Sequence, residues 1–439
     1  MRQVVDEAGA IHCLSKRIGA GGQGEVWLTE NGRRIVKILA GGADAERLRR
    51  QFIFLRRLDL TGLHVAKPNA VLRPPDVGYV ADFLSEMVAI KALMNPPAEN
   101  LAHWYLTGGG IRRRLRLLAH AGEAILGLHA RGIVYADISH NNVFVSEPVH
   151  ASEAWLIDLD NLSYDSDPKR AIYTPGYGAP EVVTRSAGCT TLSDAWAFAV
   201  LVWQTMTLCH PFIGDFVNGG EPELEDEALA GRLPWVEHSS DERNRSSTGL
   251  PPRMVLAGRL AELARRTFED GLHERQSRPT IADWVERLHN AADQTLRCTS
   301  CTGTFFVTEP TCPWCDEPRP KFGTVQLARW EPSHGLVQGA MKFGQFPITS
   351  EPWVLTARTA DGTTGLRGRE PFMRFSQTPK GMLVEPLNGR KLVVSPIASA
   401  HADRHEVGES GALLPENGWF VFHDDPSRPQ RVTIIGRSR

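Results

Sequence analysis

The sequence lacks an apolar run long enough to cross a membrane: the longest, Ala195–Trp203, falls far short of the roughly 18 residues that a membrane helix needs. Its amino terminus has no apolar segment typical of secretory signals, so we expect a cytoplasmic protein without a membrane anchor. Positive charge is not in excess either, with 49 lysines and arginines against 51 acidic residues, which argues against nucleic acid as a partner. The 439-residue chain has an ordinary globular composition, and its length indicates about three domains.

Cysteine is scarce, and the seven present are an odd number that suits no complete disulfide framework. Four of them form two Cys-x-x-Cys pairs, Cys298 with Cys301 and Cys312 with Cys315. In a reducing compartment this grouping is typical of a metal site, and a closed four-thiolate site holds Zn²⁺ in a structural role. We therefore expect a zinc ribbon over residues 295–320. A redox dithiol is the alternative, although two tandem pairs are redundant for that chemistry.

Strand-like and helix-like patterns are unevenly distributed along the chain. Residues 11–88 consist mainly of short apolar runs separated by glycine turns, whereas residues 89–290 carry long amphipathic helices. Residues 325–439 lack helical periodicity and show strand-like runs split by Asp-Gly, Lys-Gly and Asn-Gly turns. The expected fold class is therefore α+β, with two unlike lobes followed by the ribbon and an all-β, sandwich-like module.

A glycine-rich stretch stands between two of the first strand-like runs. Residues 19–26 read GAGGQGEV and fit the pattern G-x-G-x-x-G-x-V. Glycines let backbone amides approach phosphate oxygens, because no Cβ stands in the way. A dinucleotide-binding turn fits the same pattern, but here apolar strands flank the motif and no helix follows it. The nucleotide-binding residues expected in this loop are Gly19, Gly21, Gly22, Gly24 and Val26.

Four polar residues farther along supply the groups that phosphoryl transfer needs. Lys37 ends a strand and suits the α- and β-phosphates of ATP. Asn142 follows Asp137 after five positions, and Asp158 ends another apolar strand. Transfer of a γ-phosphate requires a carboxylate that orients the acceptor hydroxyl and oxygen ligands for Mg²⁺. We expect Asp137 to be catalytic together with Lys37, and Asn142 and Asp158 to bind Mg²⁺.

In content and order, these motifs resemble those of the eukaryotic-type protein serine/threonine kinases of bacteria, over residues 11–290. The resemblance implies a bilobal kinase fold, with an N-lobe over 11–88 and a C-lobe over 89–290. It also implies that Asp194 holds the catalytic loop and that Glu181, in an Ala-Pro-Glu element, pairs with Arg278. The adenine-binding hinge is expected at Glu86, Met87 and Val88, just after Ser85.

Several positions depart from the family pattern. Tyr135 and Ala136 stand where the family has histidine and arginine, so a phosphorylated activation loop would lack its usual anchor. Ser139 replaces a lysine that contacts the γ-phosphate, a loss of about 2–4 kcal/mol of transition-state stabilisation unless His140 or another cation substitutes. Asp160 replaces a glycine and would bring a second carboxylate near the metal.

The helix glutamate that normally pairs with Lys37 is not evident. Register on the helix pattern favours Gln51, and Glu46 is the other candidate. Two hydroxyls and a phenol between Asp158 and Glu181 are candidate autophosphorylation sites, or unmodified loop residues: Ser163, Tyr173 and Thr174.

The retained Lys37, Asp137 and Asp158 favour an ATP-dependent enzyme, and the Ala-Pro-Glu element favours a protein substrate. The alternative is a nucleotide-binding scaffold that recruits partners through the ribbon and the β module.

A kinase followed by a ribbon with Cys-Pro-Trp-Cys resembles the bacterial kinases of the tellurite-resistance-associated phosphorylation triad. Residues 135–145 and 156–161 also resemble the variant loops of that group. The resemblance implies two partners, a von Willebrand A-domain protein and a PPM-type protein phosphatase.

The β module over 325–439 has two interpretations. Leu366–Arg369 within a sandwich-like pattern resembles the phosphothreonine-reading forkhead-associated domains. The simpler interpretation is a sandwich that docks a partner or the kinase itself, with Trp330, Trp353 or Trp419 as anchors if they are exposed.

Overall fold

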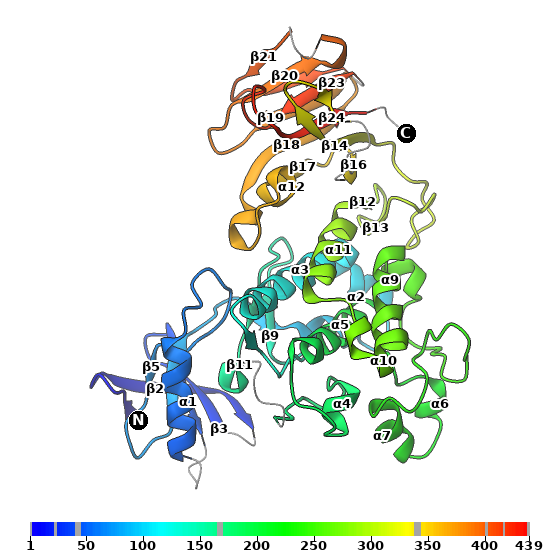
Figure 1. The fold of residues 1–439 in the computed structure, drawn as a ribbon. Coiled ribbons are helices and arrows are strands. Elements are labelled where there is room, and N and C mark those ends of the chain that lie inside the picture. The colour runs from blue at the N-terminus through cyan, green and yellow to red at the C-terminus, as the bar shows by residue number, and fades with distance from the viewer. Residues whose placement is uncertain are drawn as a thin grey trace. The chain divides into compact units, whose positions relative to one another are not determined.

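The computed structural model shown in Figure 1 describes most of the chain. The described residues are 2–21, 24–39, 45–164, 170–337, 344–399, 403–415 and 418–436. Packing divides the chain into two compact units. The first comprises residues 1–97, 117–252 and 258–285, and the second comprises 98–116, 253–257 and 286–439. The grouping of 98–116 with the C-terminal part was not indicated by the sequence.

The first unit begins with a six-stranded antiparallel sheet among its described residues, in the order β1-β2-β3-β4-β6-β5. Its strands are β1 (Gln3–Val5), β2 (Ile11–Gly21), β3 (Gly24–Thr29), β4 (Arg34–Leu39), β5 (Ala70–Val71) and β6 (Gly78–Asp82). Helix α1 (Ala45–Arg57) is amphipathic and buries Phe52 and Leu55, as the spacing of its apolar residues predicts. The strand-rich lobe expected near the amino terminus is therefore present.

Short strands and helices form the rest of this unit. The strands are β7 (Met87–Ala89), β8 (Ile133–Val134), β9 (Val143–Ser146), β10 (Ala154–Leu156) and β11 (Ser163–Tyr164). The helices are α4 (Pro180–Val183), α5 (Thr191–Thr207), α6 (Asp215–Asn218), α7 (Glu223–Leu229), α9 (Gly258–Arg265) and α10 (Gly271–His273). Three helices contain boundaries between the units: α3 (Gly110–His129), α8 (Pro252–Val255) and α11 (Ile281–Asp293).

Helix α5 explains the longest apolar run of the sequence. Thr190 caps its first turn in a reciprocal capping box with Ser193, and Leu208 in the left-handed region ends it. Nearly all residues of α5 are buried, which places the helix in the core of its lobe. A helix in such a position has apolar residues on all its faces, and this accounts for the long apolar run. No helix within the described ranges is both long and apolar enough to cross a membrane.

The second unit contains α2 (Leu101–Thr107), a cysteine-bearing hairpin and an all-β module. The hairpin strands are β12 (Thr295–Arg297) and β13 (Thr304–Phe306). One sheet of the module has the order β15-β14-β24-β23-β20-β21 with β16 paired to β14, and the other has the order β17-β18-β19-β22. The strands are β14 (Gly323–Glu331), β15 (Gly335–Leu336), β16 (Gly344–Ile348), β17 (Trp353–Thr356), β18 (Pro371–Thr378), β19 (Gly381–Pro386), β20 (Leu392–Pro396), β21 (His405–Val407), β22 (Ala412–Leu414), β23 (Trp419–Phe422) and β24 (Gln430–Ile435), with helix α12 (Ala357–Asp361) between β17 and β18.

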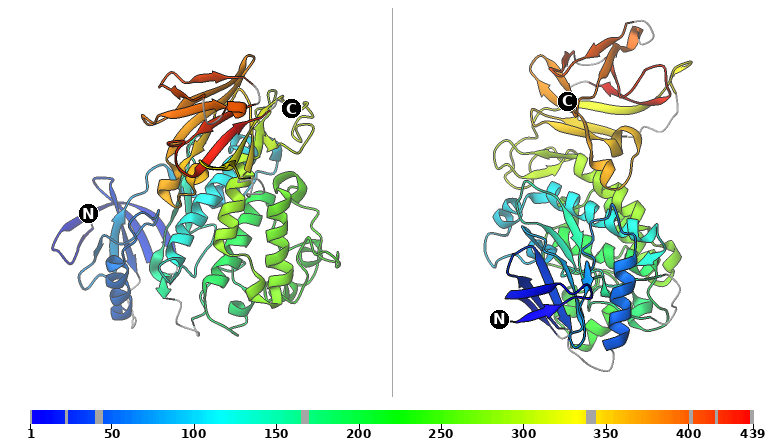
Figure 2. Two further views of the ribbon diagram at one scale, coloured as in Figure 1. Left: turned by 45° about the horizontal axis from the view of Figure 1, so that its top comes forward. Right: turned by 90° about the vertical axis from the view of Figure 1, so that its left-hand side faces the viewer.

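The two sheets of the module lie face to face (Figure 2), and one apolar cluster joins Val325 and Leu327 of β14 to Met373 and Phe375 of β18. The all-β expectation is therefore confirmed, with the sandwich layering it proposed. The tryptophans are not exposed anchors. Trp330 is 1% exposed and donates its indole N–H to the Pro426 carbonyl, and Trp353 and Trp419 pack against the core, so all three stabilise the module.

Candidate active site

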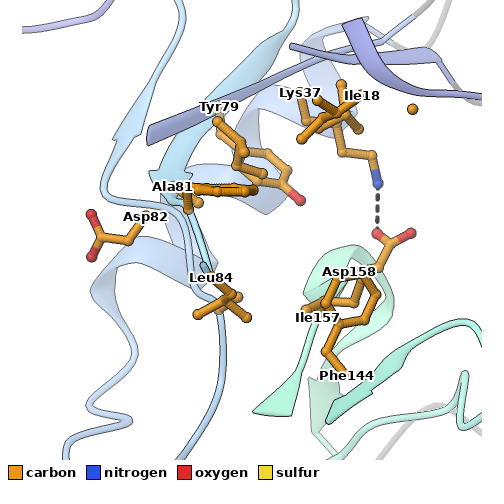
Figure 3. Close-up of a pocket in the computed structure, with 14 residues that line it drawn as sticks. Ile18, Lys37, Tyr79, Ala81, Asp82, Leu84, Phe144, Ile157 and Asp158 are labelled. Atoms are coloured by element: carbon orange, nitrogen blue, oxygen red, sulfur yellow. Dashed lines mark hydrogen bonds and ion pairs between the residues drawn. The ribbon is translucent and has the colours of Figure 1, made fainter. Parts of the chain in front are cut away.

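A cavity of about 250 Å³ lies in the first unit (Figure 3). One side is the amino-terminal sheet, and the other is formed by β9 and by the residues that follow β10. Its wall is mainly apolar and includes Ile18, Val26, Ala81, Phe144 and Ile157. Lys37 and Asp158 bring a charged pair to the same cavity. A slot with apolar faces and a polar end suits a ligand that joins a flat base to a charged tail.

The described part of the glycine-rich stretch lies at the end of β2 and the start of β3. Gly19 pairs with Val26 and Gly21 with Gly24, while Gly22 lies outside the described residues. Gly24 has a φ of 149°, and a Cβ there would lie 2.2 Å from the Ile38 carbonyl oxygen, so the fold itself requires this glycine. Gly19, which lines the cavity, would meet only ordinary contacts with a Cβ. Packing within the protein therefore does not require a glycine at position 19, whereas close approach of a ligand to the backbone would.

The residues expected to form the adenine-binding hinge lie next to the cavity wall in the sequence but do not line the cavity. Strand β6 ends at Asp82, and the cavity wall continues through Phe83 and Leu84. Glu86 and Val88 are not among the residues that line the cavity, because Val88 belongs to β7 and pairs with Val145 of β9. Contact of Glu86 and Val88 with adenine stays a prediction.

Lys37 is held by two carboxylates. Its Nζ donates to Asp158 Oδ1 and to Asp160 Oδ2, both at 2.6 Å. Burial alone would lower the pKa of Lys37, but the charges of Asp160 and Asp158 outweigh it and raise the pKa, so the ammonium stays protonated. Burial and the neighbouring Asp158 raise the pKa of Asp160 in spite of the lysine. Asp160, expected near the metal, contacts Lys37 in this structure, as Asp158 does.

Neither candidate for the helix partner of Lys37 contacts it in this structure. Gln51 donates its side-chain amide to the Leu162 carbonyl at 2.9 Å. Glu46 has an 85% exposed side chain and lies 3.9 Å from Arg50 on the same helix. Neither Gln51 nor Glu46 is therefore the partner of Lys37 in this structure.

Asp137 sits in a network of hydrogen bonds. Thr174 Oγ1 donates to Asp137 Oδ1 at 2.6 Å, and Asn142 Nδ2 donates to Asp137 Oδ2 at 3.0 Å. The Ile157 backbone N–H donates to the Asn142 carbonyl at 3.0 Å, which joins the loop of Asp137 to the strand that leads to Asp158. Thr174, predicted only as a candidate phosphorylation site, therefore also positions the loop, since its hydroxyl occupies one oxygen of Asp137.

Asp194 anchors this loop from helix α5, as the resemblance implied. Its carboxylate accepts from the backbone N–H groups of Tyr135 at 2.8 Å and Ala136 at 2.9 Å, and its Oδ2 lies 2.9 Å from His129 Nε2. Ala136 has a φ of 70°, a conformation that these bonds hold in place. The Tyr135 hydroxyl donates to the Ile157 carbonyl, so this variant residue ties the loop to the strand before Asp158.

The loss of the usual catalytic-loop lysine is not compensated by His140. Its Nδ1 lies 2.8 Å from the Tyr177 hydroxyl, which in turn donates to Gln204. Burial and the charge of Lys91 lower the pKa of His140, so the imidazole is neutral at pH 7. Ser139 is fully buried, and its hydroxyl has no partner among the described residues.

Glu181 and Arg278 form the long-range pair that the resemblance implied. Two hydrogen bonds of 2.7 and 2.8 Å join the guanidinium to the carboxylate, and the Arg278 side chain is 1% exposed. Burial would raise the pKa of Glu181, but the hydrogen bonds and charge of Arg278 lower it. The pair fixes helix α4 to the segment before α11.

Replacing Arg278 with alanine is expected to lower the free energy of unfolding by about 3–5 kcal/mol, because Glu181 is left buried without a partner. Urea denaturation of the full chain measures this change. The matched control is Arg275→Ala at an exposed neighbouring position, for which the change should stay within about 0.5 kcal/mol. Equal stabilities of the two variants would contradict a structural role for the pair.

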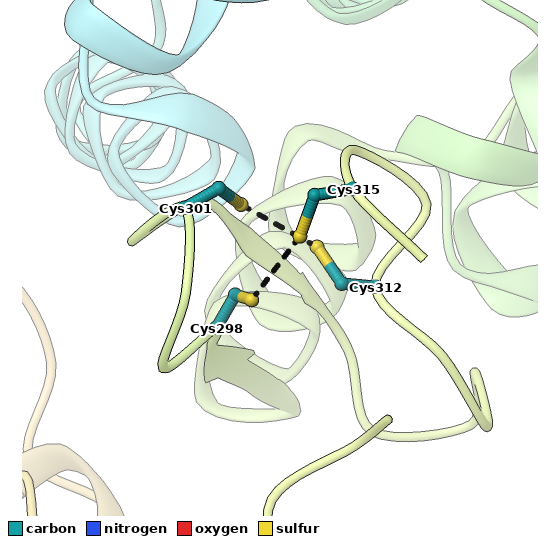
Figure 4. Close-up of side chains that lie close together, drawn as sticks. All are labelled: Cys298, Cys301, Cys312 and Cys315. Carbon is teal, nitrogen blue, oxygen red and sulfur yellow. Dashed lines mark hydrogen bonds between the residues drawn. The ribbon is translucent and has the colours of Figure 1, made fainter. Parts of the chain in front are cut away.

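The four cysteines of the second unit converge on one point (Figure 4). All four Sγ atoms lie within 4.8 Å of one another, and the Cys298–Cys315 and Cys301–Cys312 separations are both 3.6 Å. Four thiolates around one Zn²⁺ at about 2.3 Å would be separated by about 3.8 Å. The thiols therefore fit a tetrahedral site, as the spacing predicted.

The two Cys-x-x-Cys turns have matching backbones. The residue after each second cysteine, Thr302 and Asp316, has a left-handed conformation with φ of 61° and 62°. Cys298 donates its backbone N–H to Gly303, and Cys312 donates to Glu317, both at 2.8 Å. Two equivalent turns that present thiols to a common centre are typical of a structural metal site and give no open position for a substrate.

Taken together, the sheet, the cavity, the loop of Asp137 and the Glu181–Arg278 pair of the first unit resemble those of a protein kinase domain. Residues 106–284 match the family described as protein kinase domain, and residues 25–173 match the lipopolysaccharide kinase (Kdo/WaaP) family. Residues 106–284 are thus similar to a protein kinase domain.

Three individual protein kinases are similar to parts of this chain. The chain is 28% identical over 296 residues to serine/threonine-protein kinase pkn2 of Myxococcus xanthus, a match that covers 62% of this chain and 32% of the relative. It is 30% identical over 210 residues to serine/threonine-protein kinase CTR1 of Arabidopsis thaliana, covering 45% of this chain and 24% of that one. Over 101 residues it is 37% identical to human ribosomal protein S6 kinase alpha-3, covering 22% of this chain and 13% of that protein. The chain therefore spans about a third or less of each relative.

Proposed function

We propose that this protein transfers the γ-phosphate of ATP to a serine or threonine hydroxyl of a protein substrate. One observation carries the proposal: the Asp137 carboxylate, positioned by Asn142, accepts a hydrogen bond from an alcohol, the Thr174 hydroxyl. An acceptor serine or threonine needs the same contact, because a carboxylate at this place orients the hydroxyl and takes up its proton.

The other residues have separate roles in this proposal. The apolar walls of the cavity hold the base, and the Lys37 ammonium contacts the α- and β-phosphates. Mg²⁺, when bound, would neutralise charge on the β- and γ-phosphates, and the oxygen-bearing side chains of Asn142 and Asp158 suit it. Tyr135 and Asp194 keep the catalytic loop in place.

A phosphotransfer assay tests the proposal. The purified full chain is incubated with [γ-³²P]ATP and Mg²⁺, alone and with general protein acceptors such as casein, and the labelled residue is identified by phosphoamino acid analysis. We expect phosphoserine or phosphothreonine. ATP binding without turnover on any acceptor would support the nucleotide-binding scaffold instead.

The match to the lipopolysaccharide kinase family favours a second candidate function, transfer to a sugar hydroxyl of a lipid. That match ends at residue 173, before the Ala-Pro-Glu element and the Glu181–Arg278 pair, and these support a protein acceptor. A parallel reaction with lipopolysaccharide separates the two functions, because label would then appear in the lipid fraction and not in protein.

For the cysteine site, we propose one structural Zn²⁺ held by Cys298, Cys301, Cys312 and Cys315. The convergence of the four sulfur atoms supports it. The apolar core of this element is small, comprising Leu296, Phe305 and Phe322 with the cysteines, so metal binding would supply much of the free energy that keeps it folded.

We also propose that this protein acts in a bacterial phosphorylation system together with a von Willebrand A-domain protein and a PPM-type phosphatase. The Cys-Pro-Trp-Cys ribbon and the variant loops around Asp137 and Asp158 support it. In a reconstituted mixture, the kinase should label the von Willebrand A-domain protein, and the phosphatase should remove the label.

A further inference from the structure

We propose that Asp160 is the positioning residue of Lys37, in place of the glutamate that other protein kinases carry on the helix of the amino-terminal lobe. The proposal rests on the proposed kinase function and deepens it. In protein kinases the strand lysine must be paired with that helix glutamate before phosphoryl transfer can proceed. This chain has to meet the same requirement in another way, because the glutamate of its helix α1, Glu46, is exposed and lies near Arg50 instead of Lys37.

The contacts of Asp160 support this role. Its Oδ2 accepts from Lys37 Nζ at 2.6 Å, and its side chain is only 11% exposed. Tyr79 is close enough that the charge of Asp160 contributes, after burial, to raising the pKa of Tyr79. Tyr79 lies on β6 and Lys37 on β4, adjacent strands in which these two residues are paired. Asp160 is therefore held at the β4–β6 pair by its contact with the Lys37 ammonium.

The backbone around Asp158 brings both carboxylates to the same ammonium. Asp158 adopts a left-handed conformation with φ of 55° and ψ of 62°, and a 3₁₀ turn, Leu159–Asn161, follows at once. As a result, two residues separated by one position face Lys37 at equal distances. The pair permits a division of roles: Asp158 is available to the metal, while Asp160 keeps Lys37 in place.

Helix α1 makes a different contact. Gln51, at the position that the helix register favours for the glutamate, donates its amide to the Leu162 carbonyl at 2.9 Å. This neutral bond ties α1 to the segment that contains Asp160. The ion pair itself depends on no residue of α1 in this structure, so displacement of the helix would leave it intact.

Four variants of the full chain test the proposal: Asp160→Asn, Asp160→Gly, Gln51→Glu and the double variant Asp160→Gly/Gln51→Glu. Loss of a charge-assisted bond to Lys37 should lower kcat/KM for ATP by about 10- to 100-fold in Asp160→Asn and Asp160→Gly. Gln51→Glu places a carboxylate at the usual helix position, and in the double variant it should restore most of the lost kcat/KM. Glu46→Gln, at the exposed position on the same helix, is the control and should leave kcat/KM unchanged.

Two results would overturn the proposal. Wild-type kcat/KM in Asp160→Asn would show that the contact is dispensable. A variant whose defect is overcome by raised Mg²⁺, and not by Gln51→Glu, would instead identify Asp160 as a metal ligand. Binding of a fluorescent ATP analogue, measured on the same proteins together with the melting temperature, keeps the test independent of turnover. If the parent chain binds nucleotide but transfers no phosphate, the proposed function fails, while the same pattern of weakened and restored nucleotide binding would still support the role of Asp160.

Discussion

Replacing Asp137 with asparagine is expected to lower kcat by about 10²- to 10⁴-fold, the range typical for loss of a positioned general base. Asparagine has nearly the same shape as aspartate, so the backbone conformation and the hydrogen bond from the Thr174 hydroxyl can persist. The carboxylate that would accept the proton is lost. Affinity for ATP should change little, since Asp137 is not among the residues that line the nucleotide cavity. The measurement combines steady-state phosphotransfer with fluorescent-nucleotide binding.

The control for this prediction is Asp226→Asn, which changes an exposed carboxylate on α7. It should leave both kcat and nucleotide binding at the parental values. An Asp137→Asn variant with parental kcat would remove the catalytic role from this residue. A variant that loses nucleotide binding as well would point to collapse of the loop rather than to loss of chemistry.

Removing the metal from the cysteine site is expected to unfold the segment around residues 295–322. Structural zinc contributes about 10–16 kcal/mol of apparent binding free energy in small zinc-dependent peptides. Elemental analysis should find about one zinc per chain in the parent. Cys312→Ser, which replaces the most buried thiol, should lose the metal, and hydrogen exchange should become fast in this segment.

The electrostatics of the four thiols sharpen this prediction. Burial raises the pKa of Cys312 and of Cys301, whereas the Glu317 backbone N–H helps lower the pKa of Cys315 to about 7. Four thiolates cannot coexist there without a cation, so metal binding must release protons and should weaken as the pH falls. The control is Cys13→Ser in the first unit, which should keep its zinc. Metal-free parent protein with slow exchange in 295–322 would contradict the site.

The sequence predicted those parts of the site whose residues lie in local patterns. Asp137 and Asn142 share one loop, the cysteines lie in two short turns, and each pattern carries its own geometric requirement. Glu181 and Arg278 are far apart in the sequence, and their pairing followed only from the resemblance.

What the sequence missed depends on contacts between distant segments. An apolar stretch does not show where β6 ends and β7 begins, because the pairing of β7 with β9 decides that, so the sequence did not indicate that Val88 would lie outside the cavity wall. The sequence analysis looked for the partner of Lys37 on the helix, whereas in the structure the Asp160 carboxylate contacts the lysine. The left-handed conformation of Asp158 brings that carboxylate to the lysine, and the sequence does not reveal this conformation.

The β module shows the same limit on a larger scale. Its strands were predicted from alternating apolar residues, but β14 pairs with β24 across about a hundred residues of chain. That pairing buries Trp330, which the sequence alone could not distinguish from an exposed anchor.

A crystal structure with a non-hydrolysable ATP analogue and Mn²⁺ tests whether Lys37, Asn142 and Asp158 hold a nucleotide and its metal. We expect the base in the cavity beside Leu84 and Phe144, the phosphates at Lys37, and the anomalous signal of Mn²⁺ at Asn142 and Asp158. Nucleotide bound elsewhere on the chain, or Mn²⁺ away from both side chains, would contradict it.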